Sequence, residues 1–443
     1  FHFTWKKIKG DFLLRANARL IGTSAQAHRK VGWIVRKSLQ GNAAHISATM
    51  HGDGLAALQY RASAGDSTKN VGTATLQGAT SVIQLERKGN TYTMQVAREG
   101  EPFTFKQVIT LDIGDEVYAG LFVCAHDADK IETGVFSNVR IISPATSDPV
   151  SSKKYIGSQI ELLDIATQNS TIIYQSPKSL QAPNWMKDGR SLIYNSEGLL
   201  YKFDLATKTP VKLNSGTATD NNNDHVISFD GTMLAISDHS KSMHESLGYV
   251  MPITGGEPRR VTPRGSAYIH GWSPDAKYLV FAGERNGDYD IYRVPVTGGE
   301  EERMTTATGL DDGPEYSPDG KYIWFNSVRT GTMQLWRMNA DGSDQTQITN
   351  DAELYNWFPH VSPDGKWVVY LSFLKSEVKP NEHSFYKHVY LRLMPSDGGP
   401  SKVIGYLYGG QGTINTPSWS PDSKRIAFIS NNNWLFPVYP ISK

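Results

Sequence analysis

Short runs of β-forming residues follow one another along the chain, with glycine, proline, asparagine or aspartate between them. Alternation of apolar and polar residues with a period of two predicts β-strands, because successive side chains point to opposite faces of a sheet. Residues 290–295, 322–325 and 367–371 are typical runs, rich in Ile, Val, Trp and Tyr. Abundant glycine and an aromatic content of 11% fit many short strands joined by tight turns. The pattern predicts an all-β protein.

A turn motif recurs six times after residue 184 and marks a structural repeat. Its full form is Ser-Pro-Asp-Gly, in which proline presets φ for the second turn position and aspartate and glycine suit the third and fourth. Two copies, at residues 185–189 and 227–231, keep the aspartate and the glycine but lose the proline. Repeats of this length, each with four strands, are typical of β-propeller blades. The marker residues lie 42 to 58 positions apart and are Asp188, Asp230, Asp275, Asp319, Asp364 and Asp422.

The strand pairs at the two ends of the repeat region predict how the propeller closes. Residues 160–165 and 171–174 look like an outer pair that no inner pair precedes. Residues 418–430 look like an inner pair that only a short tail follows. Joining the two produces one mixed blade, so the six markers predict a six-bladed ring closed across its own ends.

The first 143 residues lack this repeat. They contain strand-like runs at regular spacing with turn signals between them, which favours a β-sandwich. Residues 144–153, rich in proline and serine, are predicted to be a linker.

Two resemblances sharpen these predictions. The Trp/Tyr-Ser-Pro-Asp-Gly-Lys turns and the Ile-Tyr-Arg-Val strands resemble the repeats of TolB-type propellers, which also occur in periplasmic scaffold proteins, peptidase propellers and oligogalacturonate lyases. The Gly-Trp-Ile-Val-Arg and His-Gly-Asp-Gly elements resemble concanavalin-like jelly rolls. The resemblances imply a concanavalin-like β-sandwich over residues 1–143 and a six-bladed TolB-like β-propeller over residues 154–443.

Charge and cysteine content restrict the partners. Lysine and arginine number 45 against 44 acidic residues, so charge favours neither a nucleic acid nor an anionic membrane. Cys124 is the only cysteine, which excludes an intrachain disulfide and a cysteine-based zinc cluster. No apolar run reaches the ~20 residues of a membrane-spanning helix, so we expect no membrane insertion. The chain begins at Phe1 without a methionine, and we expect a secreted or periplasmic protein whose signal peptide is not part of this sequence.

Polar and aromatic residues lead into the innermost strand of most blades, on the face opposite the Ser-Pro-Asp-Gly turns. We call this the loop face, and the other the turn face. The segments on the loop face are residues 223–225, 268–270, 309–315, 355–360 and 409–415. Three of the 12 histidines, His225, His270 and His360, occupy nearly equivalent positions there.

Neutral imidazoles next to carboxylates suit a divalent cation, so these three histidines predict a site for Ca²⁺, Mn²⁺ or Zn²⁺. The resemblance to oligogalacturonate lyases, which bind a metal with histidines and a glutamine, implies the same kind of site. Histidines that only form hydrogen bonds across the channel are the alternative.

The loop face also carries groups for acid–base chemistry without a metal. Asp311, Asp312 and Glu315, together with His360, are the predicted catalytic residues of glycoside cleavage. In the alternative interpretation, the two aspartates cap a turn and pair with Arg329 or Arg337. The predicted substrate-binding residues are Asn356, Trp357 as a sugar platform, Arg337, Gln411, Asn415 and His383, the last on an insertion that lengthens one repeat.

The sequence is compatible with two functions. The first is a carbohydrate-active enzyme, either a glycoside hydrolase or a metal-dependent polysaccharide lyase, that binds an oligo- or polysaccharide at the channel mouth. The second is a non-catalytic TolB-like scaffold that binds protein or glycan. The first domain could also bind glycan through Trp33, His51, Asp53, Tyr60 and Arg61; a core position for Trp33 is the alternative.

Overall fold

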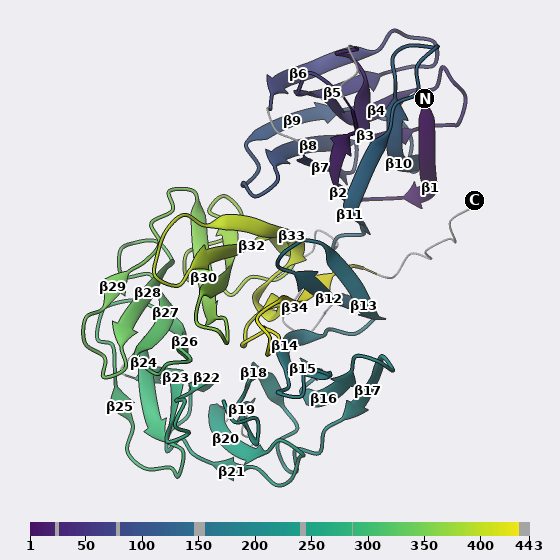
Figure 1. The fold of residues 1–443 in the computed structure, drawn as a ribbon. Helices are drawn as coiled ribbons and strands as arrows, with labels where there is room; N and C mark the ends of the chain where they lie inside the picture. The colour runs from purple at the N-terminus through teal and green to yellow at the C-terminus, as the bar shows by residue number, and fades with distance from the viewer. Residues whose placement is uncertain (23–25, 77–79, 146–155, 240–244, 286, 434–443) are drawn as a thin grey trace. The chain divides into compact units, whose positions relative to one another are not determined.

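The computed structural model describes residues 1–22, 26–76, 80–145, 156–239, 245–285 and 287–433. Strands make up nearly all the regular structure in these residues, with a short 3₁₀ helix at Gln411–Thr413 (Figure 1). The strands up to Ile142 form one compact unit, and those from Ser158 onward form another. Most of the predicted linker, residues 144–153, lies outside the described residues. In the described part of the chain, no helix is long and apolar enough to cross a bilayer.

The first unit consists of two antiparallel sheets. The six-stranded sheet has the order β1 (His2–Lys9), β10 (Glu116–Cys124), β3 (Lys30–Arg36), β4 (His45–His51), β5 (Leu55–Arg61) and β6 (Lys69–Thr75). The five-stranded sheet has the order β11 (Gly134–Ile142), β2 (Phe12–Leu20), β7 (Ser81–Lys88), β8 (Thr91–Arg98) and β9 (Phe105–Thr110).

The two sheets share one hydrophobic core. Alternate residues of β3, among them Val31 and Trp33, belong to the same buried cluster as Phe12 and Leu14 of β2. Trp33 is 1% exposed, and Tyr60 packs against this cluster. The unit is therefore a β-sandwich. The alternation along its strands points the side chains of Trp33 and Tyr60 toward the core, where they would not contact a glycan. The concanavalin-like topology stays a prediction.

Six sheets surround a common centre in the second unit (Figure 1). Five of them consist of four consecutive strands, so each blade is a local unit of the chain. From the innermost strand outward, these blades are β14 (Gln181–Trp185), β15 (Ser191–Ser196), β16 (Leu199–Asp204) and β17 (Thr209–Lys212); β18 (Asn221–Ile227), β19 (Met233–His239), β20 (Ser246–Pro252) and β21 (Arg259–Arg260); β22 (Ala267–Trp272), β23 (Tyr278–Arg285), β24 (Asp288–Pro295) and β25 (Glu302–Arg303); β26 (Asp311–Tyr316), β27 (Tyr322–Ser327), β28 (Gln334–Asn339) and β29 (Thr346–Gln347); and β30 (Leu354–Val361), β31 (Trp367–Leu374), β32 (Lys387–Pro395) and β33 (Lys402–Gly409).

The sixth sheet joins the two ends of this unit. Its strands have the order β13 (Ser170–Ser176), β12 (Ser158–Asp164) and β34 (Arg425–Asn431). Ile160 of β12 lies opposite Ile429 of β34, and both side chains are buried. Trp419 adds an isolated bridge to Ile426 where the other blades have an innermost strand. The ring is closed by strands from both ends, as the order of the strand pairs predicts.

The Ser-Pro-Asp-Gly turns are stabilised by bonds within the motif. Between β26 and β27, Ser317 Oγ donates to Asp319 Oδ1 at 2.7 Å and accepts from the Tyr322 N–H at 3.0 Å. The same serine–aspartate bond occurs at Ser228, Ser273, Ser362 and Ser420. These serines and aspartates therefore serve the turns, as expected of residues that cap their own backbone.

A β-bulge interrupts the innermost strand of each four-stranded blade. In β26 the pairing register shifts between Asp312 and Glu315, and equivalent shifts occur in β14, β18, β22 and β30. A bulge leaves a residue unpaired and redirects the side chains around it. In β26, Asp312 lines a cavity toward the loop face, whereas Glu315 lines a separate cavity toward the turn face. The bulges thus help to decide which side chains reach the channel.

Candidate functional site

A cavity of about 390 Å³ opens at the loop-face end of the channel. We call it the polar pocket. Three adjacent innermost strands, β18, β22 and β26, supply Asp224, His270 and Asp312. Four of the predicted site residues, His270, Asp312, His383 and Gln411, therefore meet in one place. The full lining is Asp224, Tyr268, His270, Ala282, Tyr289, Leu310, Asp312, Asn381, His383 and Gln411.

Asp312 lies between two imidazoles. Its Oδ1 is 3.4 Å from His270 Nε2, and its Oδ2 is 2.9 Å from His383 Nε2. Burial alone would raise the pKa of Asp312, but the hydrogen bonds and charges of the two histidines outweigh burial and hold the pKa well below its usual range. Asp312 is therefore an ionised carboxylate that fixes the orientation of both rings.

Asp224 is the second carboxylate beside His270. Its Oδ1 is 3.7 Å from His270 Nε2 and accepts a hydrogen bond of 2.5 Å from Asn415 Nδ2. Burial raises the pKa of Asp224, and the negative charge of Asp312 adds to this effect; His270 opposes it. Burial would lower the pKa of His270, but Asp224 and Asp312 outweigh it and raise the pKa. Asp224 and Asp312 both lie beside the His270 imidazole, and their pKa values are shifted in opposite directions.

Aromatic side chains surround these titratable groups. Tyr268 and Tyr289 line the pocket with ring centroids 6.2 Å apart. Phe358 stacks on His270 at 5.9 Å, and Trp357 meets His383 edge-on at 4.9 Å. Trp357 is 1% exposed, so a sugar cannot stack on its ring, and this corrects the predicted sugar platform. The ring packs against His383 instead. The two tyrosines are the aromatic groups that a ligand in this pocket would touch.

Several predicted site residues are structural. Asp311 Oδ2 accepts from Arg329 Nη2 at 2.6 Å, and that guanidinium lies 4.7 Å from the Trp336 ring centroid. This arrangement agrees with the alternative interpretation, in which Asp311 pairs with Arg329. Arg337 lies over the Tyr322 ring at 4.3 Å and does not line the polar pocket.

Asn356 and Asn415 are likewise fully buried. Asn356 Nδ2 donates to Gln334 Oε1 of the neighbouring blade at 2.9 Å, and its Oδ1 accepts from Ser372 Oγ of its own blade at 2.6 Å. Asn415 contacts the pocket residue Asp224 through its hydrogen bond to that carboxylate. Neither residue lines the polar pocket, so the predicted direct contacts with substrate are corrected.

The three histidines predicted to bind a metal face different partners. His225 Nε2 donates to the Ile193 carbonyl at 3.4 Å, whereas His270 lies between two aspartates. His360 bridges the Glu315 carboxylate and the Ile414 carbonyl. Across the described ranges, no three His, Cys, Asp or Glu side chains are arranged to hold a metal ion. The three histidines thus contact different partners, and a metal centre formed by them stays a prediction.

His225 provides a pH test of this assignment. Burial lowers its pKa to about 4 from the ordinary value of 6.5, because the ring is completely enclosed. Between these two pH values, His225 is protonated in the unfolded chain but neutral in the folded chain. The free energy of unfolding should therefore fall as the pH drops from about 6.5 to 4. His225→Leu should flatten this dependence by at most about 3 kcal/mol in urea unfolding at several pH values. His239→Gln, in the same blade, is the control; an equal slope for wild type and His225→Leu would contradict the assignment.

Sequence reasoning missed six residues that line the polar pocket, four of which carry a carboxyl, hydroxyl or amide group. Asp224 and Tyr268 lie in the segments of the loop face, immediately beside candidate histidines, and this proximity was the available signal. Asn381 lies on the same insertion as His383. Tyr289 comes from β24, the third strand of its blade, and no motif indicates that it reaches the channel.

The fold and the pocket define a class of protein: a six-bladed β-propeller, closed across its ends, with a polar pocket at one channel mouth. Residues 264–384 match the TolB β-propeller domain family. An uncharacterized protein of Agrobacterium fabrum is 45% identical over 282 residues, which are 63% of this chain and 93% of that protein. The chain belongs to the TolB-like β-propeller family.

One solved structure agrees with this family. A structure from Agrobacterium tumefaciens that bears the name TolB is 44% identical, with a TM-score of 0.60, and the match covers 64% of this chain and 100% of that chain. An oligogalacturonate lyase in complex with manganese is 15% identical, with a TM-score of 0.38, and the match covers 62% of this chain and 90% of the lyase. The second likeness is too low to transfer lyase chemistry to this chain.

Proposed function

We propose that the protein is a carbohydrate-active enzyme that cleaves an oligo- or polysaccharide in the polar pocket. The observation that carries the proposal is the pair of carboxylates, Asp224 and Asp312, whose pKa values are shifted in opposite directions at a single imidazole. Titratable groups separated in this way are typical of acid–base catalysis.

The proposed roles follow from the contacts. Asp312 accepts a hydrogen bond from His383 Nε2–H, which leaves the other ring nitrogen, Nδ1, unprotonated to act as general base. His383 suits this role because 35% of its side chain is exposed. Asp224 retains its proton more readily than an ordinary carboxyl and is the proposed general acid for the leaving oxygen. No step is assigned to a metal, since the predicted histidine ligands bind other partners.

The rest of the lining favours a glycan. Tyr268 and Tyr289 offer aromatic faces and hydroxyls, and Asn381 and Gln411 offer amides. Sugars present apolar ring faces and many hydroxyls, so such a mixture of apolar and convergent polar groups suits them. We also propose a periplasmic or secreted location, where a polysaccharide substrate would be met; fractionation of the native host tests it.

The direct test is to incubate the full chain with a panel of neutral and acidic polysaccharides. New reducing ends without ultraviolet absorbance would identify hydrolysis, and new reducing ends with the absorbance of an unsaturated sugar would identify elimination. Isothermal titration against the same panel measures binding separately. A panel that is neither bound nor cleaved would overturn the glycan function.

A non-catalytic TolB-like scaffold is the second candidate. It is favoured by the fact that both oxygens of Asp312 already contact histidines within the protein, as in a structural ion-pair network. This candidate predicts that the polar pocket binds a glycan or a protein segment and leaves it intact. Binding without new reducing ends would therefore select the scaffold over the enzyme.

A further inference from the structure

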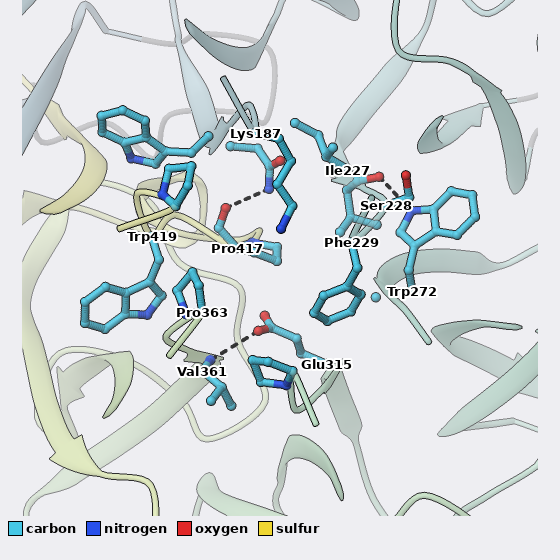
Figure 2. A pocket seen from close by; sticks show the side chains of 16 residues that line it. Lys187, Ile227, Ser228, Phe229, Trp272, Glu315, Val361, Pro363, Pro417 and Trp419 are labelled. Carbon is cyan, nitrogen blue, oxygen red and sulfur yellow. Dashed lines mark hydrogen bonds between the residues drawn. The ribbon is translucent and has the colours of Figure 1, made fainter. Parts of the chain in front are cut away.

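A second cavity, of about 140 Å³, lies at the turn-face end of the channel (Figure 2). We call it the apolar pocket. All six blades contribute to it, and it shares no lining residue with the polar pocket. The proposed cleavage uses none of its residues. Its walls are mostly aromatic rings and prolines, among them Trp185, Phe229, Trp272, Pro363 and Trp419.

The rim of the apolar pocket departs from the repeat at two adjacent blades. The second position of the turn motif is proline in four blades, but it is Lys187 in one and Phe229 in the next. The Lys187 stem lies across the neighbouring turn: a Cβ added at Gly231 would be 2.5 Å from Lys187 Cγ. An amine and an aromatic ring thus stand together at an otherwise apolar opening (Figure 2).

Several polar groups of the walls are satisfied within the protein. Trp272 Nε1 donates to the Val226 carbonyl at 2.9 Å, and Trp419 Nε1 donates to the His360 carbonyl at 3.0 Å. The two charged residues that line the pocket are Lys187 and Glu315. Lys187 is exposed at the rim and has no ion-pair partner among the described residues, so its ammonium can receive a ligand.

Glu315 is the acceptor on the opposite wall (Figure 2). Its Oε1 accepts from the Val361 N–H at 3.1 Å, and its Oε2 contacts His360 Nδ1 at 2.5 Å. A carboxylate has about four lone-pair sites, so Glu315 can accept one more donor from a ligand. An N–H group of a ligand could supply this donor.

We propose that the apolar pocket binds a carboxylate that carries a large apolar group. The carboxylate pairs with Lys187, and the apolar group packs between Phe229 and the tryptophan and proline walls. Lys187 is exposed at the rim, and its ammonium would form a charge-assisted hydrogen bond with the carboxylate, which is stronger than a neutral one. Two sources share this chemistry: a free aromatic or aliphatic acid, and the C-terminal residue of a polypeptide, whose N–H would also reach Glu315.

The test uses three probes: N-acetyl-L-phenylalanine, its uncharged amide N-acetyl-L-phenylalaninamide, and 3-phenylpropionate. Binding to the full chain is measured by isothermal titration and by tryptophan fluorescence. N-acetyl-L-phenylalanine should bind about two- to fivefold more tightly than its amide, because only the acid pairs with Lys187, which is exposed. Lys187→Met should lower the affinity for the acid by the same factor, about two- to fivefold, and leave the affinity for the amide unchanged.

Lys212→Met, at an exposed position on the outer strand β17, is the matched control and should alter neither affinity. Tighter binding of N-acetyl-L-phenylalanine than of 3-phenylpropionate would support a polypeptide C-terminus, and equal binding would support a free acid. The proposal is overturned if neither acid binds at millimolar concentration, or if Lys187→Met binds N-acetyl-L-phenylalanine like the wild type. None of these outcomes depends on glycan cleavage.

Discussion

Asp312→Asn should lower kcat for glycan cleavage by about 10²- to 10⁴-fold, the range expected when a general base loses its function. Asparagine keeps the shape of Asp312 but removes the charge that orients His383 at 2.9 Å and balances His270. KM should change much less, because Tyr268 and Tyr289 still line the pocket. Initial rates at saturating substrate separate the two parameters.

The control for this prediction is Asp341→Asn, an exposed aspartate on a turn of the same blade, which should retain the wild-type kcat. Thermal unfolding of both variants shows whether the propeller is intact. A wild-type kcat for Asp312→Asn would mean that the polar pocket is not the catalytic site.

His360→Ala should destabilise the propeller by about 3 to 5 kcal/mol, the cost of removing one partner from a buried ion pair. His360 is 3% exposed and contacts Glu315 Oε2 at 2.5 Å and the Ile414 carbonyl at 2.5 Å. Each ring nitrogen of His360 thus has a polar partner, and the alanine would leave both partners without this contact. Without it, Glu315 stays buried with a charge that no cation balances. Urea unfolding of the full chain, followed by tryptophan fluorescence, measures the loss.

The double variant Glu315→Gln with His360→Gln separates charge from packing. It removes the unbalanced carboxylate and restores hydrogen-bonding groups, so it should be more stable than His360→Ala alone. If His360→Ala cost less than about 1 kcal/mol, the pair would not be a buried ion pair in the sense used here.

The number of blades could be predicted because its signal is local. Five of the six turns are closed by a serine and an aspartate two residues apart, such as Ser317 and Asp319. Closure followed from counting strand pairs at the two ends. The inward position of Trp33 was available from period-two alternation, since its neighbours on β3 alternate between faces in the same way.

The site was predicted only in part, because it depends on register between blades. His270, Asp312 and His383 belong to segments that lead to the channel, and their chemistry was visible in the sequence. The pairing of each carboxylate with a particular histidine was not visible in the sequence. A bulge lies between Asp312 and Glu315 and directs their side chains to different cavities. No particular residue type marks such a bulge in the sequence, because its position depends on the strand pairing of the whole blade.

The pairing of β12 with β34 also sets an order of events during synthesis. Gln159 contacts Ser430, and these residues are 271 positions apart in the chain. At about 5 to 20 residues per second, β12 leaves the ribosome roughly 15 to 50 s before its partner strand exists. During that interval one edge of β12 has no neighbour, and the growing propeller is an open arc. The nascent chain is then most exposed to edge-to-edge aggregation, and the last blade to be made ends that exposure.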